Sequence, residues 1–396
     1  MADIFRVFLR LGLTSFGGPI AHLGYFREEF VTRRKWLDEA TFASIVAFCS
    51  VLPGPTSSQV GMIVGLTRGG GLGMLLAWIG FTAPSAIALA LFAFAVQAGG
   101  STPPAWLVGL LAGLTAAAAA VIAQAVLGLA RSLCTGRATQ TIAIGAAILA
   151  ISTASIAGLQ WLPIALGALA GFALLRANDD TIPAAPLAIH IRPVVAASAI
   201  VLFVAGAVFV SIASARSATA TLLATLFRAG SLVFGGGHVV LPLLQALVGE
   251  GLISGRDFFA GYGAAQAIPG PLTSFAAFLG VDNLSPLHGI WGATLATIVI
   301  FLPSALLIVG LVPFWERLRQ LPGAGRALRG ANASVVGLLA AVLYSPILTS
   351  LAAVPTRVGV ALVAFALLAV WKFPPWTAVG AAGALGIIVA LSGGTI

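Results

Sequence analysis

The residues with the clearest chemical potential are glycines and prolines that interrupt apolar stretches of the chain. They stand at Phe234-Gly235-Gly236-Gly237-His238 and at Gln266-Ala267-Ile268-Pro269-Gly270-Pro271. Proline removes a backbone N–H and clashes with the preceding helical turn, and glycine clusters leave peptide groups open to a ligand. In lipid such breaks persist only where the freed groups are buried in protein or face an aqueous cavity. They therefore mark a candidate ligand site.

Both motifs have counterparts in the first half of the chain. Phe16-Gly17-Gly18-Pro19 corresponds to Phe234–Gly237, and Pro53-Gly54-Pro55 corresponds to Pro269-Gly270-Pro271. Two further pairs follow in the same order: Pro84-Ser85-Ala86 with Pro303-Ser304-Ala305, and Gly113 with Gly330. The offset runs only from 216 residues for Pro53 and Pro269 to 219 residues for Pro84 and Pro303. A constant offset predicts an internal duplication, against the alternative that glycines and prolines of membrane helices match by chance.

The composition indicates a polytopic membrane protein. Of the 396 residues, 60% are hydrophobic and 8% are charged, whereas soluble domains have about 25% charged residues. The net charge of +9 comes from basic residues in short loops, which is typical of membrane orientation signals and not of nucleic-acid binding. The two cysteines, Cys49 and Cys134, have no metal-ligand spacing. We expect no cleavable signal peptide, because Asp3, Arg6 and Arg10 interrupt the first apolar run.

The chain is predicted to be all-α, because its apolar runs are too long for strands and do not alternate. Short apolar pieces are expected at residues 4–16, 20–30, 219–234 and 238–249, and broken pairs at 41–52 with 56–66 and at 257–268 with 272–281. Full spans of about 20 residues are expected at 72–96, 106–130, 141–157, 159–175, 193–213, 289–312, 326–344, 357–371 and 375–393. Three units follow: a first repeat at 1–176, a linker with one extra helix at 177–217, and a second repeat at 218–396.

The distribution of basic residues predicts that the two repeats have opposite orientations. The loops at 27–35 and 131–137 are basic, and the loop at 97–105 carries no charge. In the second half the bias reverses, because the basic loop is now 313–329 while 345–356 carries no charge. Since basic loops stay on the cytoplasmic side, the repeats are expected to be inverted, as in many secondary transporters with broken helices.

These motifs resemble those of a known family. Phe-Gly-Gly-Pro followed by His22-Leu-Gly-Tyr-Phe, Arg33-Arg-Lys-Trp-Leu and Leu52-Pro-Gly-Pro-Thr-Ser-Ser-Gln is similar to the amino half of the chromate ion transporters. Phe-Gly-Gly-Gly-His-Val-Val-Leu-Pro, Gly261-Tyr-Gly-Ala-Ala-Gln and Pro-Gly-Pro resemble the carboxyl half, in the long two-domain form. The resemblance implies a multi-pass protein of the bacterial cytoplasmic (inner) membrane. It also implies export of chromate and hence chromate resistance.

Chromate is a tetrahedral dianion, so its site needs N–H donors and positive potential. Helix N-termini supply both, with about half a positive charge each, and glycine runs add backbone N–H groups. The hydroxyls of Thr56, Ser57, Thr273 and Ser274 stand at new helix starts, where they either cap the helix or bind the ligand. The residues predicted to contact substrate are Arg10, Phe16, Gly17, Gly18, Pro53, Gly54, Pro55, Ser57, Ser58, Gln59, Arg228, Phe234, Gly235, Gly236, Gly237, His238, Gln266, Pro269, Gly270, Pro271, Thr273 and Ser274.

Two pairs of titratable or charged residues have open roles. Arg10 and Arg228 occupy matching positions, six residues before a Phe-Gly-Gly motif. They either act in the membrane interior or extend to its interface. His22 and His238 either carry a coupling proton, since histidine titrates near neutral pH, or serve as packing residues. We expect no cofactor and no metal, and the partners are chromate and the lipid bilayer, with a homodimer compatible with this plan.

Other functions stay open at this level. Sulfate has the same geometry and charge as chromate, so the residue types do not separate the two anions. An intramembrane enzyme would need a nucleophile with a base, or a metal set, and apart from His22 and His238 the sequence offers none. A channel also fits inverted halves. ATP hydrolysis is not expected, because Gly69-Gly70-Gly71 lacks the Gly-Lys-Ser/Thr of a phosphate-binding loop.

Overall fold

The computed structural model is helical. Every regular element in the part of the chain that it describes is a helix, which confirms the predicted all-α class. That part comprises residues 1–100, 103–153, 162–176, 189, 191–213, 217–233, 240–245, 251–281, 288–318, 321 and 323–396.

The chain begins with two short helices separated by a glycine turn. Helix α1 (Ala2–Thr14) ends before Gly17, whose φ of 98° is a left-handed conformation that favours glycine, and α2 (Gly18–Arg27) follows. The sequence predicts a solvated basic loop at 27–35, but a π-helix continues directly from α2 over Glu28–Arg33. Its residue Glu29 is buried. The loop prediction was therefore wrong there, because tertiary contacts bury a carboxylate that the local sequence places among exposed charges.

Both Pro-Gly-Pro motifs lie between helices, as predicted. Helix α3 (Glu39–Val51) ends before the first motif and α4 (Thr56–Ala98) begins after it. In the second half α12 (Gly255–Ala267) ends before the motif, and a 3-10 turn (Leu272–Ser274) leads into α13 (Phe275–Val281). Helix α4 is itself interrupted at Gly69 and Gly70, whose backbone is non-helical. This interruption confirms that 56–66 and 72–96 are separate segments.

Five helices of the described chain are long and apolar enough to cross a membrane, which supports a polytopic membrane protein. They are α4, α5 (Ala105–Leu133), α8 (Pro193–Ala213), α14 (Gly289–Leu311) and α16 (Ala324–Val342) with the π-helix Leu343–Leu348 that extends it. Four other helices have 13 to 17 residues each, fewer than the roughly 20 of a full membrane span. These are α6 (Arg137–Ser152), α7 (Leu162–Leu174), α18 (Pro355–Ala369) and α19 (Pro375–Leu391).

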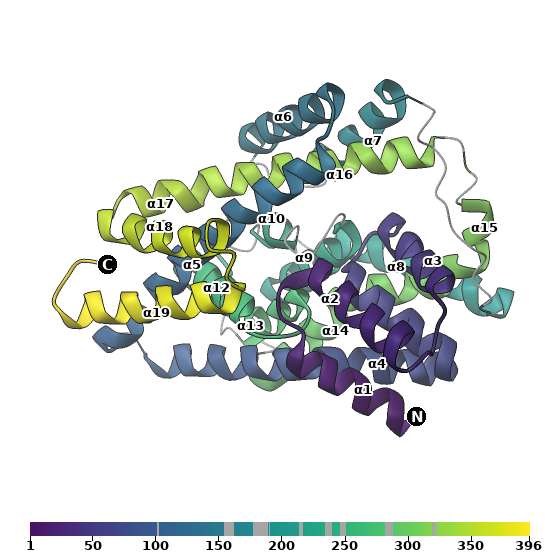
Figure 1. Cartoon of the computed structure of the whole chain (residues 1–396), viewed down its shortest axis with the longest axis horizontal. Helices are drawn as coiled ribbons and strands as arrows, with labels where there is room; N and C mark the ends of the chain where they lie inside the picture. The colour runs from purple at the N-terminus through teal and green to yellow at the C-terminus, as the bar shows by residue number, and fades with distance from the viewer. Residues whose placement is uncertain are drawn as a thin grey trace.

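The four short helices pack on the long helix of the other half. Helices α6 and α7 lie along α16, and α18 and α19 lie along α5 (Figure 1). Glycines allow the close approach at both places. A Cβ at Gly113 of α5 would meet the backbone of Ala382 in α19, and a Cβ at Gly330 of α16 would meet the backbone of Gly167 in α7. Each half of the chain therefore completes the packing of the other.

Two further helices pack on a long helix of their own half. Helix α1 packs on α4, and α9 (Ala218–Leu232) packs on α14. Short helices α10 (Val240–Leu244), α15 (Trp315–Leu318) and α17 (Thr349–Ala352) connect the longer ones. The end of α4 and α17 lie toward the left of Figure 1, whereas the N-terminus and α15 lie toward the right. The core between them contains both Pro-Gly-Pro motifs, whose surroundings form the candidate site.

Candidate functional site

Two backbone hydrogen bonds join the Pro-Gly-Pro motif of each half to the other half. The N–H of Gly54 donates to the carbonyl of Val233 at 2.6 Å, and the N–H of Gly270 donates to the carbonyl of Ser15 at 3.0 Å. Ser15 and Val233 each directly precede a Phe-Gly-Gly motif. The structure therefore brings the first Phe-Gly-Gly motif beside the second Pro-Gly-Pro motif. The residues at 234–239, which include Phe234, Gly235, Gly236, Gly237 and His238, lie outside the described residues.

A serine of the opposite long helix faces each central glycine. Gly54 has a φ of 132°, and a Cβ there would meet Ser304 Oγ and the side-chain amide of Gln59. Gly270 has a φ of 107°, and a Cβ there would lie 2.8 Å from Ser85 Oγ. Ser85 in α4 and Ser304 in α14 are both buried, and each follows a proline inside its helix. Sequence analysis identified these Pro-Ser pairs only as repeat markers, although their recurrence beside broken helices was a usable signal for the site.

The helices that begin after the two breaks have no side-chain caps. The capping positions are Pro55 and Pro271, which offer no side-chain acceptor. The hydroxyls in the first turn bond other side chains and not the helix N–H groups. Ser57 Oγ lies 3.2 Å from His22 Nδ1, and Ser274 Oγ lies 2.7 Å from Ser85 Oγ. The alternative that these hydroxyls only cap their helices is therefore not what the structure shows. Free N–H groups at a helix start leave partial positive charge there.

Several buried polar atoms around the breaks have no hydrogen-bond partner in the described part of the chain. Burying an unpaired polar group is costly, so such atoms indicate a site for water or a polar ligand. Gln59 illustrates this, because its amide nitrogen donates to the Pro53 carbonyl at 2.8 Å while its oxygen has no partner. The unpartnered atoms are Ser15 Oγ, Ser58 Oγ, Gln59 Oε1, Thr82 Oγ1, Gln266 Nε2 and Thr273 Oγ1. Sequence analysis missed Ser15 and Thr82, which carry no motif.

The imidazole of His22 lies against the first of these helix starts. Its Nδ1 lies 3.2 Å from Ser57 Oγ and its Nε2 lies 3.1 Å from the carbonyl oxygen of Ser15. Phe81 of α4 contacts the ring edge to face, with 5.3 Å between ring centroids. The side chain is 1% exposed. His22 therefore connects α2 to the Pro-Gly-Pro break and to the residue before Phe16.

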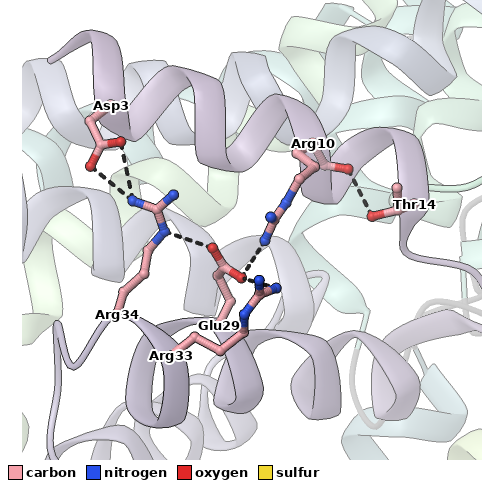
Figure 2. Close-up of polar contacts among 6 residues, drawn as sticks. All are labelled: Asp3, Arg10, Thr14, Glu29, Arg33 and Arg34. Atoms are coloured by element: carbon pink, nitrogen blue, oxygen red, sulfur yellow. Dashed lines mark hydrogen bonds and ion pairs between the residues drawn. The ribbon is translucent and has the colours of Figure 1, made fainter.

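Arg10 belongs to a charge cluster beside the site (Figure 2). Its guanidinium donates to the carboxylate of Glu29, which also accepts from Arg34 Nε at 2.7 Å and pairs with Arg33 at 3.4 Å. Arg34 also donates from Nη1 to the Asp3 carboxylate at 3.1 Å. The Glu29 side chain is 4% exposed, whereas that of Arg10 is 46% exposed. Hydrogen bonding to Glu29 raises the pKa of the Arg34 guanidinium. The cluster fixes the start of the chain to the π-helix.

Arg228, the counterpart of Arg10, has different contacts. Its Nη2 donates to the carbonyl of Val210 in α8 at 3.3 Å. That carbonyl lies near the C-terminus of α8, where a cation is favourable. The hydrogen bonds place Arg10 and Arg228 against Glu29 and α8, respectively, and not against the Pro-Gly-Pro motifs. A direct substrate contact by either arginine stays a prediction.

Two apolar cavities between α4 and α14 do not suit an anion. They have volumes of about 260 and 360 Å³, and both are lined by Trp78 of α4 and Ile298 of α14. The other residues that line them are apolar except for Thr82, Thr294 and Thr297 of the larger cavity. Thr294 and Thr297 already donate to carbonyl groups of α14, so an oxyanion would lose its hydration there for few donors. The buried hydroxyls and helix starts at the breaks are the better candidate.

The chain matches the chromate transporter family over residues 2–173 and 220–387, which include the motifs just described. The chain belongs to this family. A chromate transport protein of Pseudomonas aeruginosa is 29% identical over 93% of this chain and 87% of its own length. A chromate transport protein of Cupriavidus metallidurans is 26% identical over 94% of this chain and 88% of its own length.

An uncharacterized transporter of Methanocaldococcus jannaschii is 27% identical over 86% of this chain and 83% of its own length. No solved structure matches the chain. Family membership and the long apolar helices make this chain a multi-pass membrane transporter and not an enzyme. The resemblance stated from the motifs is confirmed.

Proposed function

We propose that the protein exports chromate across the bacterial cytoplasmic membrane and thereby confers chromate resistance. The observation that carries the proposal is the group of unpartnered hydroxyls and uncapped helix starts at the crossed Pro-Gly-Pro motifs. Two relatives over most of the chain are named chromate transport proteins. One chain supplies both Pro-Gly-Pro motifs and the serines that face them. A homodimer would therefore add stability without being needed to complete the site.

In this proposal the anion lies between the Pro-Gly-Pro and Phe-Gly-Gly motifs of the two halves. Ser58 Oγ and Thr273 Oγ1 are buried and unpartnered, so they can donate to oxyanion oxygens. Each helix start adds about half a positive charge. Gly17 and Gly18 supply backbone N–H groups in left-handed conformations, with φ of 98° and 78°. Neutral donors and helix ends thus offset part of the charge of a dianion, without a lysine in the site.

Sulfate is the second candidate substrate, because hydroxyl and N–H donors serve any tetrahedral dianion equally well. The deciding experiment is uptake of radiolabelled chromate into vesicles that contain the purified protein. Membrane potential and pH gradient are imposed separately, and unlabelled sulfate is added as a competitor. Saturable chromate flux is the expected result, and the effect of excess sulfate on it then decides between the two anions. Equal inhibition by sulfate would broaden the substrate to oxyanions in general, and absence of chromate flux would contradict the proposal.

We further infer that units 1–176 and 218–396 are inverted repeats, joined by 177–217. Two observations support this inference. Backbone hydrogen bonds join the Pro-Gly-Pro motif of each half to the other half, and the long helices α5 and α16 are each covered by short helices of the other half. A third observation is the separation in Figure 1, where the end of α4 and α17 lie opposite the N-terminus and α15.

Single-cysteine labelling in intact cells checks the orientation. Cysteines in the loops at 27–35, 131–137, 176–192 and 313–329 should react only after permeabilisation, because these basic loops are expected to be cytoplasmic. Cysteines at 97–105, 250–256 and 345–356 should react from outside. The background is a variant with Cys49 and Cys134 replaced, both of which are buried. Labelling of 27–35 and 250–256 from the same side would overturn the inverted arrangement.

A further inference from the structure

The hydrogen bonds of His22 fix where its protons lie. A carbonyl oxygen only accepts, so the contact of 3.1 Å to the Ser15 carbonyl requires a proton on Nε2. In the neutral ring Nδ1 is then an acceptor, and the Ser57 hydroxyl donates to it across 3.2 Å. If the ring gains a proton, Nδ1 becomes a donor and Ser57 Oγ must accept. The Ser57 hydroxyl proton is then free to point to another partner.

The freed hydroxyl would point within the candidate anion site. Ser57 is the second residue of α4, and its neighbours Ser58 and Gln59 each have an unpartnered buried oxygen. Protonation also adds a full positive charge beside a helix start. Both changes favour an anion at the same place, because anions are bound by donors and positive potential.

From this geometry we propose that His22 binds a proton together with the oxyanion, and that the Ser57 hydroxyl couples the two binding events. The proposal rests on the function proposed above and adds the coupled ion. A dianion would then cross with one proton, in the same direction. Because coupling is reciprocal, the bound anion strengthens proton binding as much as the proton strengthens anion binding.

The proton site also contacts the second half of the chain. The Ser15 carbonyl accepts both from His22 Nε2 and from the N–H of Gly270, at 3.1 and 3.0 Å. A change at the imidazole therefore reaches the second Pro-Gly-Pro motif through one shared acceptor. Protonation of His22 can therefore affect the hydrogen bond between the two halves without any intermediate residue.

No charged group competes for the ring in the described part of the chain. Its recorded partners are Ser15, Ser57 and Phe81, which are uncharged. The charges on α2 and on the elements packed against it are engaged elsewhere or exposed: Arg27 pairs with Glu39, Arg33 with Glu29, and Arg68 lies over Trp36, while Glu28 is exposed. The positive charge of a protonated His22 is thus neutralised chiefly by the bound anion.

The test measures proton movement during chromate flux in vesicles that enclose a pH-sensitive dye, with the voltage clamped. It is run at a pH alkaline enough that chromate itself carries no proton. Wild-type protein should move protons in the direction of chromate, and its chromate affinity should fall as the pH rises, because proton and anion binding are coupled. His22→Gln keeps an N–H for Ser15 but does not titrate, so its affinity should be independent of pH and its flux proton-free.

Three further variants separate coupling from folding. Ser57→Ala removes the coupling hydroxyl and should weaken the pH dependence while His22 remains, whereas Ser57→Thr should retain it. His288→Gln replaces an exposed histidine and should behave as wild type. Chromate flux without protons in the wild-type protein would overturn this inference alone, and so would an unchanged pH dependence in His22→Gln. Absence of any chromate flux in the wild type would instead overturn the proposed function.

Discussion

Gly54→Ala and Gly270→Ala should each reduce chromate flux strongly while leaving most of the protein in the membrane. Both glycines have positive φ, at 132° and 107°, where an L-residue is strained by about 1–3 kcal/mol. The new methyl group would also press on Ser304 and Gln59 at Gly54, and on Ser85 Oγ at Gly270. If the strain raises the free energy of the chromate-binding conformation alone, the affinity for chromate decreases by about 5- to 150-fold.

The measurement is chromate flux per molecule of membrane-inserted protein, with insertion quantified by immunoblot. Gly128→Ala is the matched control, because Gly128 in α5 has no atoms within 4 Å of an added Cβ. Gly270→Ala combined with Ser85→Ala removes the contact with Ser85 Oγ but leaves Ser85 Cβ at 3.1 Å and the strain in φ, so it should recover only part of the flux. Full flux in Gly54→Ala would show that the first break does not shape the site.

Glu29→Gln should destabilise the protein more than any other single charge removal in the cluster of Figure 2. The carboxylate is buried and pairs with Arg10, Arg33 and Arg34 at once. Removing it leaves three guanidinium groups without a common counter-ion. Breaking a buried pair costs about 3–5 kcal/mol, but these arginines are partly exposed and can turn to water. We therefore expect a loss of about 1–3 kcal/mol.

Thermal unfolding in detergent checks this expectation as a fall in Tm. Glu39→Gln is the control, because the Glu39–Arg27 pair is more than half exposed on both sides and should leave Tm nearly unchanged. Arg10→Gln should have a smaller effect than Glu29→Gln, since Arg33 and Arg34 still neutralise the carboxylate. Equal Tm values for Glu29→Gln and wild type would show that the cluster contributes little to the fold.

Local sequence was sufficient to predict the helix breaks. Proline at 53, 55, 269 and 271 dictates them through its missing N–H and fixed φ, and the structure confirms both. The burial of Glu29 was not predictable in this way. Its partner Arg10 lies 19 residues earlier, and only packing of α1 beside the π-helix brings them together.

The candidate site residues lie at the helix breaks, and their contact with substrate stays a prediction. The motifs identified the glycines, Ser57, Ser58 and Thr273, which stand at the breaks in the structure. The facing residues Ser85 and Ser304 depend on how α4 and α14 cross, and no spacing within either half specifies that contact. Helix α19 ends at Leu391, two residues before the end of the span predicted at 375–393, and α18 has the predicted length but begins two residues earlier, at Pro355.

The exchanged packing of α5 and α19 has a consequence for biosynthesis. Helix α5 ends at Leu133, but the last helix that covers it is complete only at Leu391. At about 5–20 residues per second, the ribosome needs roughly 13 to 50 seconds to make the intervening chain. During that interval the glycine-lined face of α5, including Gly109 and Gly113, has lipid or a membrane chaperone as its neighbour. A truncated nascent chain that lacks α19 would therefore leave α5 uncovered, and we expect such a chain to be degraded by quality-control proteases.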